Sequence, residues 1–286
     1  VGKVMVDAGA PVAVETPTYL GALQAFNPYE PIYTSLAGDA DGPLPESIRA
    51  LPHDAPGTRF AYLLPNFQNP TGRTMTEERR AAVAQVAIDT GLPIIEDNPY
   101  GDLWFDAPPA PSLSARHPDG SVYLGSFSKI LAPGLRLGYL AASKELVPYL
   151  VRLKQAADLH SNRLSQWLVN QQLLSPAREQ RINDLCDTYR TKRNRFDDAL
   201  HHYFGDIAIW TKPAGGLFFW LELNRKIDTR LLLPKAIERN VIFMPCENFY
   251  ADASDGIGTM RLNFSLMDSN QTELGLKRLS ELIRLA

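Results

Sequence analysis

Short apolar runs alternate with longer amphipathic stretches through the first half of the chain. The stretch Thr76–Thr90 has helical spacing, and the apolar runs are rich in Val, Ile and Leu, as buried strands are. Strands separated by helices are typical of an α/β fold, with a mostly parallel sheet covered on both faces and right-handed crossovers. The predicted strands are Val12–Glu15, Phe60–Leu64, Pro93–Glu96, Val122–Gly125 and Leu137–Ala141.

After Lys144 the pattern changes to long helices followed by a mixture of strands and helices. This order predicts a smaller α+β domain, joined to the first by the longest helix. We therefore expect a large domain over 1–175 and a small C-terminal domain over 176–286. The predicted elements are helices at Glu145–Leu159, Arg163–Leu174, Ala177–Tyr203, Thr229–Arg239 and Gln271–Leu285, and strands at Ile207–Thr211, Leu217–Glu222, Val241–Met244 and Thr259–Phe264.

Two further segments have a recognisable pattern. Val1–Gly9 reads as the end of a helix stopped by glycine, and Val1 is not an initiator methionine. We expect an N-terminal part to precede it. The segment 38–43, Gly-Asp-Ala-Asp-Gly-Pro, has the composition of a solvated loop.

Composition narrows the class of protein. The chain has 286 residues, 45% hydrophobic and 21% charged, with a net charge of -3, which gives no sign of a nucleic-acid surface. Cys186 and Cys246 fit neither a disulfide framework nor a metal site, and His201–His202 fits a helix surface. No apolar run reaches the ~18 residues of a membrane span, and no signal peptide is visible. We expect a cytoplasmic protein without a metal, nucleic-acid or membrane partner.

The most informative chemistry lies around Lys129. Ser126 and Ser128 precede this lysine, and Arg136 follows it closely. A lysine in such a setting can form a Schiff base with an aldehyde cofactor, while the hydroxyls and the arginine hold that cofactor's phosphate. The segment predicts a covalent cofactor site.

Polar residues that follow predicted strands could complete this site, because ligands bind beyond the carboxyl ends of parallel strands. Asp97 ends a buried strand and could pair with a protonated ring nitrogen, although it could instead cap the next turn. Asn69 and Tyr100 could donate to a ring oxygen. Alternatively, Asn69 only makes a turn and Tyr100 is an interface aromatic.

Two more candidates lie at opposite ends of the chain. Tyr19 follows the first predicted strand and could stack on a planar cofactor, although such a tyrosine is more often part of the core. Arg261 lies in a strand pattern that points it away from its apolar neighbours, so it could hold a substrate carboxylate in a bidentate fork. The alternative for Arg261 is a surface position on an edge strand.

Four segments together resemble one family. These are Pro-Asn-x-x-Asn-Pro-Thr-Gly at 65–72, Glu-Asp-x-Pro-Tyr at 96–100, Ser-Phe-Ser-Lys-x-x-Ala-Pro-Gly-Leu-Arg-x-Gly at 126–138 and Arg-Leu-x-Phe-Ser at 261–265. Their order and spacing are similar to those of class I pyridoxal-phosphate aminotransferases of fold type I. The branch that they resemble most contains kynurenine/2-aminoadipate and LysN-like enzymes. The resemblance runs along the whole chain.

The resemblance implies a role for each candidate. Lys129 would carry pyridoxal 5'-phosphate and move a proton, with Asp97 on the ring nitrogen. Asn69 and Tyr100 would bind the ring oxygen, and Tyr19 would stack on the ring. Arg261, with Asn69, would hold the substrate. The phosphate contacts would come from Ser126, Ser128 and Arg136.

The resemblance also implies the reaction and the assembly. An amino group would pass from an amino acid, such as 2-aminoadipate or an aromatic one, to a 2-oxo acid such as 2-oxoglutarate, in a homodimer. The family's phosphate-binding turn and N-terminal arm would lie ahead of Val1. Two alternatives stay open. One is the aminotransferase-like effector domain of a GntR/MocR-type transcription regulator, although no basic helix-turn-helix is visible. The other is a pyridoxal-phosphate β-lyase or decarboxylase.

Overall fold

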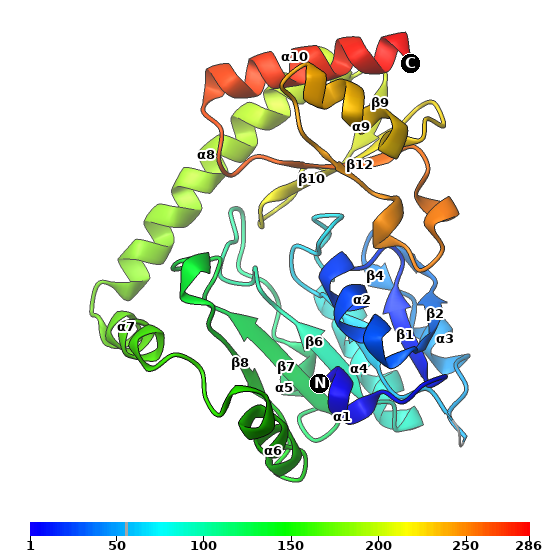
Figure 1. Cartoon of the computed structure of the whole chain (residues 1–286), viewed down its shortest axis with the longest axis vertical. Helices are drawn as coiled ribbons and strands as arrows, with labels where there is room; N and C mark the ends of the chain where they lie inside the picture. Colours follow the sequence, from blue (N-terminus) through cyan, green and yellow to red (C-terminus); the bar gives the residue numbers. More distant parts are fainter. Residues whose placement is uncertain (55–56) are drawn as a thin grey trace.

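The structure, a computed structural model, describes residues 1–54 and 57–286. Its larger sheet has six strands in the order β2-β1-β5-β6-β7-β8 (Figure 1). Neighbouring strands from β2 to β7 run parallel, and β8 pairs antiparallel with β7 at the edge. The mostly parallel α/β sheet is therefore confirmed. Its strands are β1 (Pro11–Glu15), β2 (Ile32–Leu36), β5 (Ala61–Leu63), β6 (Ile94–Asp97), β7 (Ser121–Ser126) and β8 (Gly138–Ala141).

Alternating side chains of these strands build two apolar layers, one on each face of the sheet. Ala13 and Leu63 pack with the helices on one face, whereas Val12 and Val14 pack with those on the other. The first face is covered by α3 (Pro45–Arg49), α4 (Glu77–Thr90) and α5 (Leu113–Arg116). The second is covered by α1 (Gly2–Met5) and α2 (Leu20–Phe26), with α6 (Val147–Asp158) against α1.

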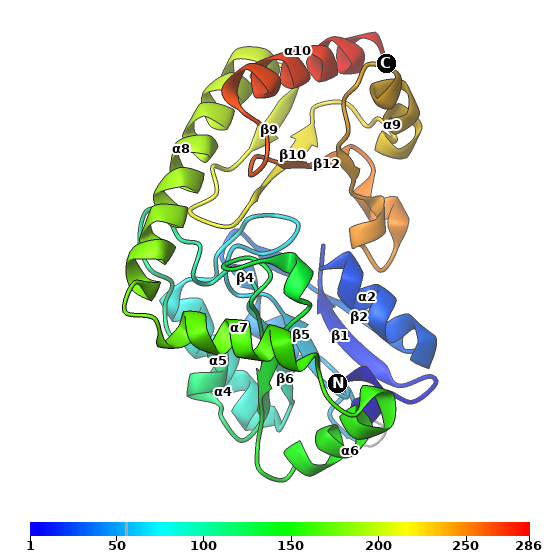
Figure 2. The same ribbon diagram turned by 60° about the vertical axis from the view of Figure 1, so that its left-hand side comes forward.

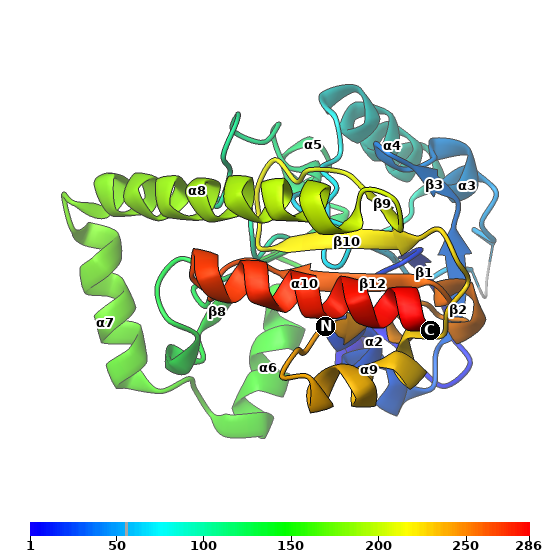
Figure 3. The same ribbon diagram turned by 90° about the horizontal axis from the view of Figure 1, so that it is seen from above.

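A second, antiparallel sheet has the order β11-β12-β10-β9. Helices α8 and α10 lie along one side of this sheet, as Figure 3 shows from above. Phe219 and Leu221 of β10 face the helices, whereas Phe218 and Trp220 contribute to other clusters. The elements are β9 (Ala208–Trp210), β10 (Phe218–Leu223), β11 (Met244–Pro245), β12 (Thr259–Asn263), α7 (Arg163–Leu174), α8 (Arg178–Phe204), α9 (Thr229–Glu238) and α10 (Ser269–Leu285).

Helix α8 connects the two sheets, running beside the larger one and up to the smaller one (Figure 2). Two apolar clusters fill the junction between the sheets. One contains Phe67, Tyr100 and Phe218, and the other places Leu20 against Trp220 and Phe249. The junction therefore has a packed core of its own. The division into domains 1–175 and 176–286 stays a prediction.

Two of the sequence-based expectations need correction. The segment 38–43 is a short hairpin of β3 (Gly38–Asp39) and β4 (Gly42–Pro43), whose second strand is buried. Arg79 fixes it by donating to both carboxylate oxygens of Asp39, at 3.0 and 2.8 Å, so it is not simply a solvated loop. The predicted strand at 241–244 is also displaced, because pairing with β12 begins only at Met244.

Candidate active site

The candidate residues of the larger sheet come from the ends of its central strands. Tyr19 follows β1, Asn69 follows β5, Asp97 is the last residue of β6, and Lys129 follows β7. Parallel strands present their carboxyl ends at one edge of a sheet, so this edge gathers the four side chains. Arg261 reaches the same place from β12 of the smaller sheet, where its guanidinium donates to Asn69.

Lys129 is a half-buried amine between two cations. Its Nζ lies 5.7 Å from the centre of the Tyr100 ring, and none of the ion pairs among the described residues includes it. Burial, followed by the charges of Arg261 and Arg136, lowers the pKa of Lys129. A lowered pKa increases the neutral fraction of the amine, which is the form that attacks an aldehyde.

Asp97 is held by a tyrosine that sequence reasoning missed. The Tyr62 hydroxyl donates to Oδ2 of Asp97, and in the part of the chain that the structure describes no donor contacts Oδ1. Burial raises the pKa of Asp97, and the bond from Tyr62 partly offsets this effect. The side chain bonds to Tyr62 instead of capping the next turn. A buried carboxylate with one oxygen unbonded is suited to a cationic partner.

Asn69 bridges the two sheets. Its Oδ1 accepts from Arg261 Nη1 at 2.6 Å, and its side chain is also hydrogen-bonded to Tyr100. Asn69 and Tyr100 are 4% and 3% exposed. The alternative in which Asn69 only makes a turn is therefore wrong.

Arg261 lies in the interior of the smaller sheet, because β12 pairs with both β10 and β11. The edge-strand alternative is wrong. Its guanidinium lies over the Phe218 ring at 4.0 Å and near the Phe249 ring at 5.1 Å. Burial lowers its pKa, yet a guanidinium stays charged at any physiological pH. Two aromatic faces thus hold a forked cation at the junction.

Tyr19 precedes α2 and remains 38% exposed, so the alternative core position is wrong. Its ring folds back over Gly21, where an added Cβ would lie 2.5 Å from the Tyr19 Cζ. Tyr19 is also one of the groups whose charge raises the pKa values of Tyr62 and Tyr100, after the effect of burial. An accessible ring at this edge is free to pack against a planar ligand.

The three predicted phosphate ligands occupy the turns around Lys129. Ser126 ends β7, and its Oγ accepts from the Ser128 backbone N–H at 3.1 Å. Arg136 is exposed, has a left-handed backbone with φ of 49°, and donates to the Pro133 carbonyl at 3.3 Å. Its charge acts on Lys129. The structure therefore places hydroxyl groups and a cation on either side of the lysine.

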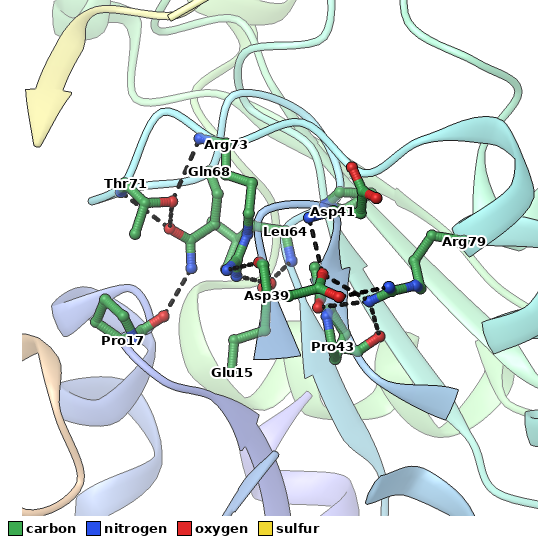
Figure 4. Close-up of polar contacts among 12 residues, drawn as sticks. Glu15, Pro17, Asp39, Asp41, Pro43, Leu64, Gln68, Thr71, Arg73 and Arg79 are labelled. Atoms are coloured by element: carbon green, nitrogen blue, oxygen red, sulfur yellow. Dashed lines mark hydrogen bonds and ion pairs between the residues drawn. The ribbon is translucent and has the colours of Figure 1, made fainter. Parts of the chain in front are cut away.

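A buried polar group fixes the loop that carries Asn69 (Figure 4). The carboxylate of Glu15 accepts from the Leu64 backbone N–H at 2.7 Å and from Arg73 at 3.2 Å. Gln68 donates to the Pro17 carbonyl at 2.7 Å and accepts from Thr71. These bonds tie the loop to the segment before Tyr19. Glu15 is the last residue of β1, as Asp97 is the last residue of β6. An acidic residue at the end of an apolar strand could therefore have indicated Glu15 from the sequence.

A second missed group lies on α4, which covers one face of the sheet. The side chain of Arg80, 0% exposed, donates to Asn66 Oδ1 at 2.5 Å and to three backbone carbonyls. Asn66 donates to Asn98 Oδ1 at 2.9 Å, and Asn98 donates to the Tyr123 hydroxyl at 2.8 Å. This chain of bonds links the ends of β5, β6 and β7, and so fixes the strand that carries Asp97.

A cavity of about 630 Å³ opens beside the Asn69 loop, between the two sheets. Trp220, the cross-strand partner of Arg261, contributes one wall, and Arg73 contributes the opposite one. Directly opposite residues of an antiparallel pair point to the same face. The face of the smaller sheet that carries Arg261 therefore continues into this cavity.

The donor set fits pyridoxal phosphate. The amine of Lys129 suits the aldehyde, and the unbonded oxygen of the Asp97 carboxylate suits a protonated ring nitrogen. The Asn69 and Tyr100 side chains are hydrogen-bonded to each other, and their N–H and O–H groups are of the kind that suits the ring oxygen. Across residues 1–54 and 57–286, no group of three or more His, Cys, Asp or Glu side chains is arranged to hold a metal ion.

Comparison with known proteins agrees with this chemistry. The sequence model of the family "Aminotransferase class I and II" matches residues 42–279. The chain belongs to this family, and its cofactor is pyridoxal phosphate.

Particular relatives share most of their length with this chain. Aromatic-amino-acid aminotransferase 1 of Thermococcus litoralis is 38% identical, over 99% of this chain and 69% of the relative. The 2-aminoadipate transaminase of Thermus thermophilus is 37% identical, over 99% and 72%. The crystal structure of Pyrococcus horikoshii kynurenine aminotransferase matches with a TM-score of 0.93 and 36% identity, over 99% of this chain and 71% of that one. The fold type I assignment is confirmed.

A transcription factor also matches. An uncharacterized HTH-type transcriptional regulator of Bacillus subtilis is 31% identical, over 96% of this chain and 56% of the regulator.

Proposed function

We propose that this protein transfers the amino group of an α-amino acid to a 2-oxo acid by way of pyridoxal phosphate. The observation that carries the proposal is the meeting of three groups at one sheet edge. These are the depressed-pKa amine of Lys129, the buried carboxylate of Asp97, and the Arg261 guanidinium bonded to Asn69. Pyridoxal phosphate supplies an aldehyde that condenses with amines and a ring that withdraws electrons from the bonds at Cα.

Each side chain has a proposed part in this reaction. Asp97 would keep the ring nitrogen protonated, because a carboxylate with a donor on only one oxygen can accept a hydrogen bond from that nitrogen. Asn69 and Tyr100 would bind the ring oxygen, and Tyr19 would pack on the ring. The Lys129 amine would hold the cofactor through its aldehyde and, when free, would move the proton at the substrate Cα. The phosphate would rest on Ser126, Ser128 and Arg136.

The substrate is bound through its α-carboxylate. Arg261 offers a planar fork that matches a carboxylate, and the rings of Phe218 and Phe249 hold the fork in place. The relatives are named for aromatic amino acids and 2-aminoadipate, and the matching crystal structure is a kynurenine aminotransferase. We propose donors of this range, with 2-oxoglutarate as the acceptor.

The test is a screen of amino donors with 2-oxoglutarate, in which glutamate is measured as the product. We expect turnover with 2-aminoadipate or an aromatic amino acid, and we expect loss of activity in Arg261→Lys for every donor, since lysine keeps the charge but not the fork. Loss for one donor alone would assign Arg261 to a side-chain pocket. Absence of glutamate with all donors would contradict the proposed reaction.

The second candidate function is that of an effector module in a transcription regulator, favoured by the 31% identity to the Bacillus subtilis regulator. A purely ligand-sensing module would bind the cofactor at Lys129 without steady-state turnover. Repeated rounds of 2-oxo acid formation per protein molecule therefore separate the two functions.

We also propose a homodimer that buries the outer faces of α6 and α7. Both helices expose large apolar side chains, among them Tyr149 at 58% and Trp167 at 57%. An apolar surface of this kind commonly marks an interface. Light scattering should report a dimer, and Trp167→Glu should shift it towards monomer, whereas Lys277→Glu, at an exposed position on α10, should leave it a dimer. A monomeric unaltered protein would contradict the assignment.

We propose a cytoplasmic location, because Cys186 and Cys246 are both free thiols. In the described ranges, no helix has the length and apolar character needed to cross a membrane. Fractionation of the source cells is the corresponding measurement.

A further inference from the structure

Tyr62 is a phenol at the centre of an otherwise aliphatic strand. It is 1% exposed, between Ala61 and Leu63 of β5. A buried hydroxyl needs a partner, and this one donates to Oδ2 of Asp97. None of the four motifs includes Tyr62, and none of the steps proposed above uses it.

The sheet sets this contact. Tyr62 pairs in register with Ile95 of the neighbouring parallel strand, and both belong to the apolar cluster on the same face. Asp97 lies two residues beyond Ile95, and therefore on that face as well. The Phe26 ring packs edge-on against the Tyr62 ring at 5.8 Å. The phenol is thus held so that its hydroxyl reaches the end of β6.

The contact has two consequences for the carboxylate. It occupies one oxygen, so the carboxylate plane is fixed and only Oδ1 is left for a ligand. It also opposes the effect of burial, which on its own raises the pKa of Asp97. Burial and the Asp97 charge raise the pKa of Tyr62 well above its ordinary value, so the phenol stays a donor at any working pH.

We propose that Tyr62 is a positioning residue that keeps Asp97 ionised and oriented, with Oδ1 aimed at the ring nitrogen of the cofactor. This inference rests on the proposed pairing of Asp97 with that nitrogen. Tyr62 touches neither the cofactor nor the substrate, and acts only through the carboxylate. Tyr62 should therefore strengthen binding only of a cofactor that has the ring nitrogen. General support of the fold would strengthen binding of a cofactor with or without this nitrogen.

The experiment measures the affinity of the apoprotein for pyridoxal phosphate and for its 1-deaza analogue, in which carbon replaces the ring nitrogen. Tyr62→Phe keeps the ring and removes only the hydroxyl. We expect its affinity for pyridoxal phosphate to fall about 10-fold or more, as for a lost hydrogen bond to a charged group. Its affinity for the deaza analogue should stay unchanged, which also reports an intact fold.

The matched control is Tyr33→Phe. Tyr33 lies in β2 of the same sheet, and its hydroxyl donates to Asn27 and to the Leu23 carbonyl, so its loss should leave the ratio of the two affinities unaltered. Without the Tyr62 hydroxyl, the pKa of Asp97 is no longer held down. As the pH is lowered, Tyr62→Phe should therefore lose affinity for pyridoxal phosphate at a higher pH than the unaltered protein does.

A third variant separates this inference from the proposed function. Asp97→Asn should abolish the preference for pyridoxal phosphate over the deaza analogue. If it does so while Tyr62→Phe keeps the full preference, the role of Tyr62 is refuted and the pairing of Asp97 stands. If Asp97→Asn keeps the preference, the pairing itself is wrong and the role of Tyr62 falls with it. Equal weakening for both ligands in Tyr62→Phe would mean a purely structural role.

Discussion

Lys129 is surrounded by arginines and aromatic rings instead of carboxylates, and this determines how its amine behaves. Arg261 and Arg136 disfavour the protonated form, as burial does. A nucleophilic lysine needs such an environment, because only the neutral amine attacks a carbonyl. The same arginines suit the two anionic ends of the proposed ligand pair, the phosphate and the substrate carboxylate.

Lys129→Ala should remove covalent capture of the cofactor. We expect the unaltered protein to retain a reduced adduct after borohydride treatment, and the variant to retain none and to lose turnover. Peptide mass spectrometry locates the adduct. An adduct trapped on another lysine in the variant would show that Lys129 is not the attachment point.

Arg261→Gln should raise the pKa of Lys129, because one of the two positive charges that lower it is gone. The neutral fraction of the amine at a given pH then falls, so capture of free pyridoxal by the apoprotein should shift to higher pH. Arg152→Gln, on α6, is the control, since Arg152 lies against Tyr149 and not beside Lys129. An unshifted profile would mean that solvent screens the Arg261 charge.

At the scale of elements, periodicity was sufficient for the helices of ten or more residues and for most strands, whereas the short helices α2, α3 and α5 were missed. Thr76 caps α4 by accepting from the Arg79 N–H, and Gly91 ends it with φ of 67°, so both signals could be read from the sequence. Strand β2 was missed because its apolar residues do not form a continuous run: the polar residues Thr34 and Ser35 follow Ile32 and Tyr33. This strand is also only partly buried. The register of β12 with β10, which brings Arg261 to Asn69, depends on contacts between residues far apart in the chain.

The sequence indicated the candidate residues that lie at strand ends and carry distinctive chemical groups. It did not indicate the residues that only hold those side chains in place. Lys129, Asp97 and Asn69 follow apolar runs, and the prediction placed them at one edge. Tyr62 and Arg80 look like ordinary members of a strand and a helix in the sequence. Only the folded chain shows that their polar atoms are buried against the site.

The bonds of Arg80 should contribute strongly to the stability of the sheet end. Arg80→Met removes the donor from Asn66 Oδ1 and from the carbonyls of Met75, Pro65 and Ala110. Buried acceptors without donors are costly, so we expect the free energy of unfolding to fall by about 3 kcal/mol or more.

Chemical denaturation measures this effect. The matched control is Arg49→Met, which removes an exposed pair with Asp89 at 3.5 Å and should cost about 0.5 kcal/mol or less. Similar costs for the two variants would mean that water replaces Arg80 without penalty.

For the whole molecule, the contacts of α8 with the loops of the larger sheet matter most. Arg193, 3% exposed, donates to both carboxylate oxygens of Asp106, at 2.6 and 3.0 Å, and to the Pro213 carbonyl. Arg190 donates to the Phe105 carbonyl at 2.6 Å, and Arg181 to the Ile130 carbonyl at 2.6 Å. The helix is thus fastened at several points to the segment that follows Asp97 and to the one that follows Lys129.

Arg193→Met should lower the free energy of unfolding by about 2–3 kcal/mol, as expected for lost hydrogen bonds between charged groups with one partner half exposed. Thermal unfolding measures the change. Arg195→Met, on the same helix, removes only an exposed bond to Ser269 and should have little effect. An equal loss in both variants would place the cost in the helix and not in the junction.

Because α8 is long, these hydrogen bonds affect the position of the smaller sheet relative to the larger one. Its 27 residues make a rod of roughly 40 Å, at 1.5 Å per residue. The smaller sheet, with Arg261, packs on the far half of this rod, whereas Lys129 belongs to the body beside its near half. Arg193 is the last of these fastenings, so the free part of the rod, residues 194–204, is roughly 16 Å long. A tilt of about 7° in this part would displace its end by roughly 2 Å. A displacement of this size at Arg261 is enough to break its bond to Asn69, so the arginines along α8 limit how far the smaller sheet can move away from the larger one.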